Sequence, residues 1–360
     1  MKIGLVTLQK AYNSFGASLQ AYATFNLLSN LGHEVKIIDV ARTNSLLFIP
    51  SKHYATTNQN NYYRSLPYTF LYILRNFKRY RRFKKFNNRC NYTRYYNKLD
   101  WLFKKPPIFD IYITGSDQVW NPTLDTNLDT FLLMFAPEDA KLLSFASSIG
   151  LNHMPEEYKD LFVKGLKRYQ NISVREEKAR SIIEELTGRI DVEVVLDPTL
   201  LLSKDFWSKI ADKPLMEDYV LSFCLNYDKT KMDISHEIAR LMNKKLVVIG
   251  QKIEGYEDVT FINDAGPEQW LGLMKNSSHI FSDSFHGTAF AINFRKSFTS
   301  YISNQEKASR IVGLLDKFGL SNCLYNKQYE LQKPEYDDAF ENMMSNEIKH
   351  SIAFLESALS

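Results

Sequence analysis

Short apolar runs alternate with amphipathic stretches along most of the chain. At the N-terminus, residues 1–8 and 35–40 are rich in apolar and β-branched side chains, as expected of strands buried on both faces of a parallel sheet. Between them, from Ala17, apolar residues recur at helical spacing until Gly32, which supplies a C-terminal cap. The opening segment therefore predicts a β–α–β unit, the start of a doubly wound α/β domain.

The same alternation continues toward the C-terminus. Further strands are predicted within residues 109–122, 142–150, 171–180, 192–202, 219–225, 245–250 and 279–283, and helices over 231–242, 266–275 and 306–320. A polar run at 209–218 separates two groups of strands, so we expect one Rossmann-like domain over residues 1–210 and a second over 211–334. Residues 335–360 predict an amphipathic helix that packs back across both domains.

Length and composition agree with a two-domain globular protein. A chain of 360 residues exceeds what one hydrophobic core usually supports. The three cysteines form no CxxC pair, so neither a zinc site nor a disulfide framework is predicted, and neither GxGxxG nor a Walker A sequence is present. The apolar run in MKIGLVTL is too short for a signal peptide, and no window of about 18 apolar residues indicates a membrane span. These features predict a cytoplasmic protein.

The formal charge of +4 hides an uneven distribution. Between Arg64 and Lys105, thirteen Lys and Arg residues stand against a single acid, Asp100, with phenylalanine and tyrosine interleaved among them. Residues 66–89 predict a helix within this basic insert, which spans residues 64–105 of the N-terminal domain. Three interpretations compete: a solvated helix that packs its rings on its own domain, a peripheral contact with an anionic membrane or a lipid diphosphate at the inner face of the membrane, and a nucleic-acid site. No recognised motif supports the last, so we expect no nucleic-acid partner.

The stretch Ser282–Phe290, SDSFHGTAF, ends one predicted strand and begins a helix. Free backbone N–H groups and the positive end of the dipole at a helix N-terminus favour an anion. Ser284 and Thr288 add hydrogen-bonding groups, and Gly287 allows a ligand to approach the backbone. His286 is a side chain that can carry a proton near neutral pH. The alternative is an N-capped helix with a histidine packed at its start.

Polar turns also follow the predicted strands of the first domain, at the carboxyl edge where ligands bind in such folds. Arg175 can grip a carboxylate or phosphate with two hydrogen bonds; the alternative is an ion pair with Glu176 or Glu177. The residues suited to hold a sugar acceptor, by hydrogen bonds or by ring stacking, are Asn13, Gly16, Gln20, Ser116, Asp117, Gln118 and Trp120. A purely structural turn is the alternative for the segment around Asp117.

The motifs YNSFGASLQAYA, GSDQVWN, SVRE, VLDPTLLL and SFHGTAFAINF occur in this order, and together they resemble the polysaccharide pyruvyl transferase family from about Met1 to Leu320. The resemblance implies a GT-B-like fold, with two Rossmann-like domains facing each other across a cleft. It also implies an enzyme of cell-surface glycan or exopolysaccharide synthesis that moves the enolpyruvyl group of phosphoenolpyruvate onto two hydroxyls of a glycan or lipid-linked sugar. A pyruvate ketal forms and phosphate is released. The family's donor ligands would correspond to Arg175 and His286, with Lys307 or Arg310 as a further basic ligand.

The candidate residues suit this chemistry. Phosphoenolpyruvate carries a phosphate and a carboxylate, which need cationic or N–H groups, and His286 is a candidate general acid. Asp117 and Asp283, the acids at the predicted cleft edge, are the candidates for a general base that activates the attacking hydroxyl; the alternative for Asp283 is to orient His286. We expect no metal, because no cluster of metal ligands is visible, and no cofactor besides the donor substrate itself.

Two other functions compete. A GT-B glycosyltransferase that uses a nucleotide sugar should carry an acid for the ribose hydroxyls about two turns into the helix after Ser284, and AINFRKSF contains none. A non-catalytic binder of anionic glycans would not need both Arg175 and His286 on opposite domains.

Overall fold

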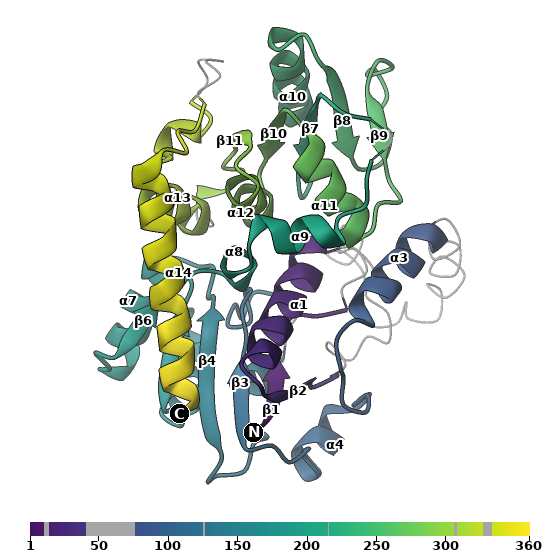
Figure 1. Ribbon diagram of the computed structural model, residues 1–360. Helices are drawn as coiled ribbons and strands as arrows, with labels where there is room; N and C mark the ends of the chain where they lie inside the picture. Colours follow the sequence, from purple (N-terminus) through teal and green to yellow (C-terminus); the bar gives the residue numbers. More distant parts are fainter. Residues whose placement is uncertain (11–13, 41–75, 125–126, 215, 306–307, 327–332) are drawn as a thin grey trace.

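The computed structural model describes residues 1–10, 14–40, 76–124, 127–214, 216–305, 308–326 and 333–360. Over these residues the chain forms two parallel sheets, one above the other in Figure 1, with helices packed on their faces. The strands of the first sheet run in the order β2-β1-β3-β4-β5-β6. Their bounds are β1 Lys2–Val6, β2 Glu34–Ile37, β3 Ile111–Thr114, β4 Lys141–Ser147, β5 Asn171–Val174 and β6 Val192–Val194.

The second sheet has the order β11-β10-β7-β8-β9, and all of its neighbouring strands are parallel. Its strands are β7 Tyr219–Phe223, β8 Lys245–Ile249, β9 Thr260–Ile262, β10 His279–Ser282 and β11 Ser297–Ser300. In each sheet the strand order reverses beside the first strand of the unit, as in doubly wound folds. The predicted α/β class with two Rossmann-like units is therefore confirmed.

Helices connect the strands and enclose both sheets. In the first domain they are α1 Phe15–Asn30, α3 Phe77–Asn87, α4 Leu99–Lys104, α5 Leu128–Phe131, α6 Glu156–Leu166 and α7 Glu177–Thr187. Two short helices, α8 Pro198–Leu201 and α9 Lys204–Ile210, lie between the sheets in the sequence, and α9 ends at the predicted domain boundary. The later helices are α10 Lys229–Leu241, α11 Pro267–Asn276, α12 Phe285–Asn293, α13 Ser309–Lys317, the 3₁₀ turn η4 Ser321–Cys323 and α14 Asp338–Leu359.

The C-terminal helix α14 crosses from the second domain to the first, as the sequence predicted (Figure 1). Near its start, Phe340 packs on Phe318 beside α13. Near its end, Phe354 stacks on Phe145 of β4, and the Ser351 hydroxyl accepts a hydrogen bond from the backbone N–H of Leu196 at 3.0 Å. One amphipathic helix therefore links both domains.

In the described part of the basic insert, some aromatic rings are buried, whereas Phe77, Tyr95, Trp101 and Phe103 are exposed. Phe83 and Phe86 of α3 are fully buried and contact rings of α1. On the same helix, Arg82 forms an ion pair with Asp264 at 3.0 Å. Lys85 of α3, and Arg89 just beyond its end, both pair with Glu268 of α11. The predicted helix over 66–89 is thus found from Phe77 to Asn87, and its residues 66–75 lie outside the described part. Contact of the insert with an anionic membrane stays a prediction. Within the described chain, no helix combines the length and apolar character needed to cross a bilayer.

Candidate active site

The stretch SDSFHGTAF forms the end of β10 and the first turns of α12, as predicted. The hydroxyl of Ser284 caps α12 by accepting a hydrogen bond from the Gly287 backbone N–H at 3.4 Å. A Cβ on Gly287 would overlap with the side chain of Ser282, so this glycine serves close packing of α12 on β10. The predicted role of Gly287 in admitting a ligand stays a prediction. The Thr288 hydroxyl is buried and lies 2.7 Å from that of Ser300, and its predicted contact with phosphoenolpyruvate also stays a prediction.

His286 points out of its own domain and toward the first one. Its ring lies against Gly16 near the start of α1, where an added Cβ would overlap with the imidazole Nδ1. Its Nε2 atom is 3.7 Å from Oδ2 of Asp197 and has no hydrogen-bond partner. The histidine of the second domain is therefore held between two segments of the first.

Arg175 follows β5 and is buried at the same place. Its Nη1 donates to Oδ2 of Asp197 at 2.7 Å, and the ring of Phe285 lies 4.1 Å from the centre of the guanidinium. The Nε and Nη2 atoms are buried without a hydrogen-bond partner, and the carboxylates nearest to them, those of Glu176 and Asp117, are 3.7 and 3.8 Å away. Arg175 thus keeps two N–H donors free to bind an anion.

A second guanidinium, from Arg310 on α13, lies close to Arg175. Burial, and then the positive charge of Arg175, lower the pKa of Arg310 to about 10. Its Nε atom is also buried without a partner. The carboxylates of Asp197, Glu176 and Asp117 lie within 3.8 Å of Arg175, so they partly compensate the two like charges. Lys307, the other predicted basic ligand, lies outside the described residues.

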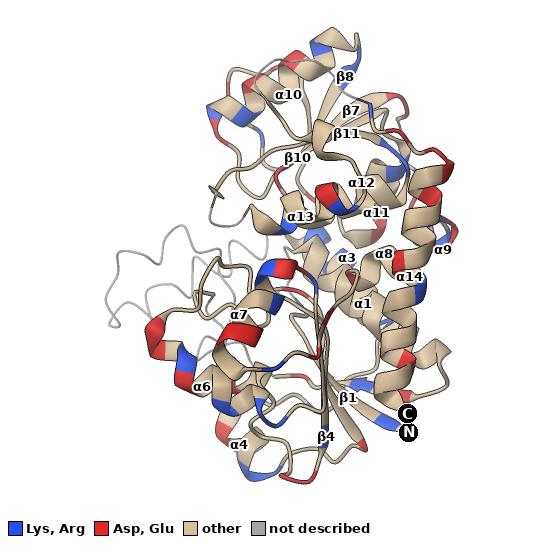
Figure 2. Cartoon of the chain, turned by 90° about the vertical axis from the view of Figure 1, so that its left-hand side faces the viewer, with Lys and Arg blue, Asp and Glu red and all other residues tan. Residues whose placement is uncertain are grey.

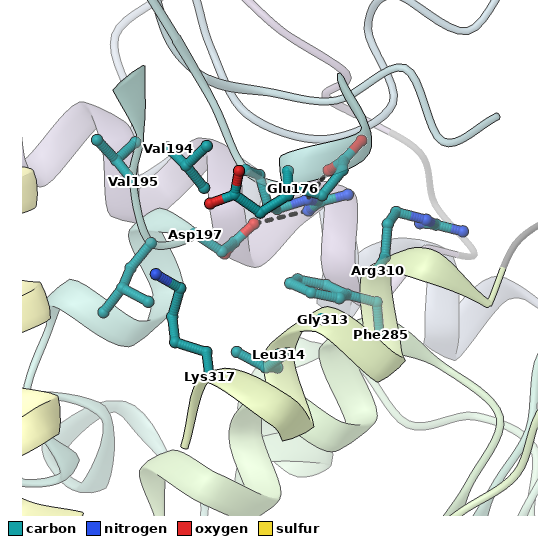
Figure 3. Close-up of a pocket in the computed structure, with 12 residues that line it drawn as sticks. Glu176, Val194, Val195, Asp197, Phe285, Arg310, Gly313, Leu314 and Lys317 are labelled. Atoms are coloured by element: carbon teal, nitrogen blue, oxygen red, sulfur yellow. Dashed lines mark hydrogen bonds and ion pairs between the residues drawn. The ribbon is translucent and has the colours of Figure 1, made fainter. Parts of the chain in front are cut away.

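Arg175, Asp197 and Arg310 are among the residues that line a pocket between the two domains (Figure 3). Arg175, Glu176 and Asp197 come from the carboxyl edge of the first sheet, and Arg310 and Lys317 from α13 of the second domain. Lys317 forms an ion pair with Glu347 of α14 at 2.8 Å, so its charge is already partnered. In Figure 2, α13 lies above α7 across the division between the domains. Strand ends of one domain and a helix of the other therefore build the pocket together.

Asp197 is the residue of this site that the sequence interpretation missed. Its side chain is completely buried, and Oδ2 also accepts a hydrogen bond from the Ser116 hydroxyl at 2.8 Å. Burial alone would raise the pKa of Asp197, but the adjacent His286 and Arg175 outweigh it and hold this pKa well below the usual range. The available signal was the Asp-Pro pair that closes β6, where Asp197 caps α8 through the Thr199 backbone N–H.

A sequence model of the family described as polysaccharide pyruvyl transferase matches residues 15–306. The chain belongs to this family. No curated protein matches the chain. The motifs that predicted the family, from the turn before α1 to SFHGTAF, fall within or next to the matched region.

Solved structures place this pyruvyl transferase family member in the GT-B fold. The UDP-GlcNAc 2-epimerase of Methanocaldococcus jannaschii is 13% identical, with 97% of this chain and 100% of that chain covered at a TM-score of 0.51. The corresponding enzyme of Neisseria meningitidis is 11% identical, with 100% and 99% covered at a TM-score of 0.52. At such low identity the likeness shows the fold alone, and it confirms the predicted GT-B-like architecture.

Several residues predicted to hold the family's sugar acceptor serve the fold instead. Trp120 is fully buried against Phe162 and Tyr169, and its indole N–H donates to the Phe131 carbonyl, so no ring face is available to a sugar. Gln20 is also fully buried, and its amide bonds to the Leu8 carbonyl at 2.8 Å. These two acceptor predictions are corrected.

The remaining acceptor candidates divide between the pocket edge and the interior. Asp117 lies 3.8 Å from Arg175 and has a φ of +77°, a backbone conformation that often marks functional sites. Gln118 is half-buried next to it, and its amide oxygen accepts a hydrogen bond from Asn121. Ser116 is buried on Asp197 and Gly16 is covered by His286, so both act within the protein. Asn13 lies outside the described residues.

Asp283 does not orient His286. Its Oδ2 binds the ammonium group of Lys231 at 2.9 Å and the hydroxyl of Ser303 at 2.8 Å, and its Oδ1 accepts from the Leu225 backbone N–H. The carboxylate is therefore turned into the second domain, away from the pocket. This corrects the expectation that Asp283 orients His286 or acts as the base, and it leaves Asp117 as the candidate base.

Proposed function

We propose that the protein transfers the enolpyruvyl group of phosphoenolpyruvate onto two hydroxyls of a sugar, carried on a glycan or on a lipid diphosphate, and releases phosphate. The observation that carries the proposal is the set of unfilled donors at the domain interface. Arg175, Arg310 and His286 each hold a buried nitrogen atom without a hydrogen-bond partner. Because buried polar atoms are nearly always paired, this concentration favours a bound anion. Family membership favours phosphoenolpyruvate as that anion.

A complete reaction can be written with these side chains, in which every proton and the leaving phosphate are accounted for. A protonated His286 gives its proton to the methylene carbon of the donor, and the first sugar hydroxyl adds to the adjacent carbon. The bond from that carbon to the phosphate oxygen breaks, and the second hydroxyl closes the ketal. One hydroxyl proton leaves with phosphate and the other, taken up through Asp117, restores His286. Arg175 and Arg310 stabilise the phosphate as it departs, so this scheme needs neither a metal nor a cofactor.

Two other functions are less well supported. The UDP-GlcNAc 2-epimerases with similar folds are described with UDP-GlcNAc bound, which makes a nucleotide-sugar glycosyltransferase the second candidate. However, α12 carries no acid along its length to hold a ribose. A non-catalytic glycan binder would not require a histidine with an open nitrogen atom beside a buried carboxylate.

Phosphate release from phosphoenolpyruvate by the full-length protein tests the proposal. We expect release only with a hexose or N-acetylhexosamine acceptor, and a loss of roughly a hundredfold or more in His286→Gln and Arg175→Gln. His236→Gln and Arg180→Gln change the same residue types outside the pocket and should retain activity. Unchanged release in His286→Gln would exclude the role given to this histidine. Turnover of a UDP-sugar in place of phosphoenolpyruvate would favour the second candidate.

A further inference from the structure

Asp197 is the single carboxylate on which the functional groups of both domains converge. Its Oδ2 atom accepts from Arg175 of the first domain and faces Nε2 of His286 from the second. We propose that Asp197 is a positioning residue, which fixes Arg175 and His286 relative to each other across the cleft and keeps Nε2 of His286 turned toward the bound donor. This inference rests on the proposed function and deepens it, since it names the group that prepares the general acid.

The carboxylate is held so firmly that its direction is fixed. Oδ1 accepts two hydrogen bonds from Thr199, from the backbone N–H at 3.0 Å and from the hydroxyl at 2.6 Å. Oδ2 accepts from the Ser116 hydroxyl at 2.8 Å and from Arg175 at 2.7 Å. Four hydrogen bonds to a side chain with no solvent exposure leave it no second orientation. Oδ2 therefore presents its charge to His286 in a constant geometry.

The contacts around His286 hold its ring at this oxygen atom. Its Nε2 atom faces Oδ2 of Asp197, the same oxygen that accepts hydrogen bonds from Arg175 and from the Ser116 hydroxyl. The ring lies against Gly16 near the N-terminus of α1, and Phe285 contacts it edge-on. One carboxylate oxygen therefore sets the positions of both groups relative to each other.

A comparison within the same chain separates this role from ordinary structural burial. Asp283 is also a buried carboxylate after a strand, but Lys231 and Ser303 satisfy it inside one domain. In contrast, Oδ2 of Asp197 lies 3.7 Å from Nε2 of His286, which is too far for a hydrogen bond. That spacing leaves Nε2 of His286 free to donate its proton to a bound substrate while the carboxylate still stabilises the charge.

The test separates kcat from KM for phosphate release in Asp197→Asn. Removing the carboxylate should lower kcat by roughly a hundredfold, with a smaller change in the KM for phosphoenolpyruvate, because the general acid is displaced. Thr199→Val removes a hydrogen bond from the carboxylate and keeps its charge, so it should lower kcat by a smaller factor. A merely structural role would reduce the fraction of folded protein and leave kcat per folded molecule unchanged in both variants, and that result would overturn the proposal.

A second measurement does not depend on turnover. At one fixed pH, the NMR signals of the His286 imidazole, assigned by their loss in His286→Gln, should move in Asp197→Asn and keep the wild-type position in Arg180→Gln. Unchanged ring signals in Asp197→Asn would overturn the inference even if the enzyme releases phosphate. Displaced signals in a protein that never uses phosphoenolpyruvate would keep the positioning role and reject the proposed function. If Asp197→Asn does not fold, the kcat of Thr199→Val decides, and an unchanged value would contradict the proposal.

Discussion

At the scale of single residues, the site is recognisable by what its side chains lack. Most buried polar atoms in a folded protein have hydrogen-bond partners. Here Arg175 keeps two free N–H groups and Arg310 one open nitrogen atom in the same pocket, and His286 keeps one open nitrogen atom beside Asp197, which also lines that pocket. In the proposed function, the energetic cost of these unfilled groups is recovered when the anionic donor binds.

Gly16 offers a direct test of how His286 is held. In Gly16→Ala the new methyl group would overlap with the imidazole and displace it, although alanine suits a helix better than glycine. We expect activity to fall by roughly tenfold or more, as for a general acid moved out of place, while the overlap lowers stability by about 1–3 kcal/mol and leaves the variant folded at the assay temperature. Steady-state phosphate release and a thermal melt measure the two effects. Full activity in Gly16→Ala would show that the ring position does not matter.

The sequence revealed the polar residues that follow a strand or begin a helix, because such positions have a local signature. His286 and Arg175 were found in that way. Asp197 was missed because its meaning depends on partners far away in the sequence, including His286 in the other domain. Trp120 was misjudged for a related reason: a tryptophan in a polar turn suggests exposure, and only the packing of α6 and Tyr169 buries it.

At the scale of elements, apolar runs predicted the strands well, whereas helix ends were less certain. The helix expected from residue 306 begins at Ser309, and the helix expected from Ala17 begins at Phe15, where the Ser14 hydroxyl caps it. Caps depend on a single side chain and its backbone geometry, which a hydrophobic pattern does not encode. The basic helix α3 was ambiguous because two of its charges have partners in the other domain: Arg82 pairs with Asp264, just before α11, and Lys85 pairs with Glu268 of α11.

The pairing of β10 with β11 contains a buried pH-sensitive contact. His279 of β10 lies between the hydroxyls of Ser297 and Thr299, and burial lowers the pKa of His279 to about 4. The unfolded chain therefore binds a proton on this residue at higher pH than the folded one. Stability is complete above about pH 6.5 and is lost progressively as the pH falls toward 4, at about 1.4 kcal/mol for each pH unit.

Urea unfolding at pH 7 and pH 5 measures this effect. The wild type should lose about 2 kcal/mol of unfolding free energy through His279 over that interval. His279→Gln can still bond both hydroxyls but does not titrate. Its unfolding free energy should therefore fall by about 2 kcal/mol less than that of the wild type between pH 7 and pH 5. His236→Gln, on the surface of α10, provides the matched control and should behave as the wild type. An identical pH dependence in His279→Gln and the wild type would refute the assignment.

At the scale of the whole molecule, the active site depends on an element that touches none of its ligand-binding groups. Helix α14 spans both domains and ends against the first sheet. Its Ser351 hydroxyl accepts the backbone N–H of Leu196, the residue immediately before Asp197. The C-terminal helix thereby supports the segment that presents the shared carboxylate, which explains how a distant part of the chain can influence the pocket.

Ser351→Ala tests this support. The change leaves the buried Leu196 N–H without a partner, which should cost about 1–3 kcal/mol of unfolding free energy. Because the released segment carries Asp197, the kcat of phosphate release should also fall. This loss should be seen even under conditions where the variant is fully folded. Ser357→Ala removes an exposed hydroxyl from the same helix and should change neither quantity. If Ser351→Ala and Ser357→Ala match the wild type in urea unfolding and in kcat, α14 does not hold this part of the site, and the segment before Asp197 must be fixed by α8 and its Thr199 contacts alone.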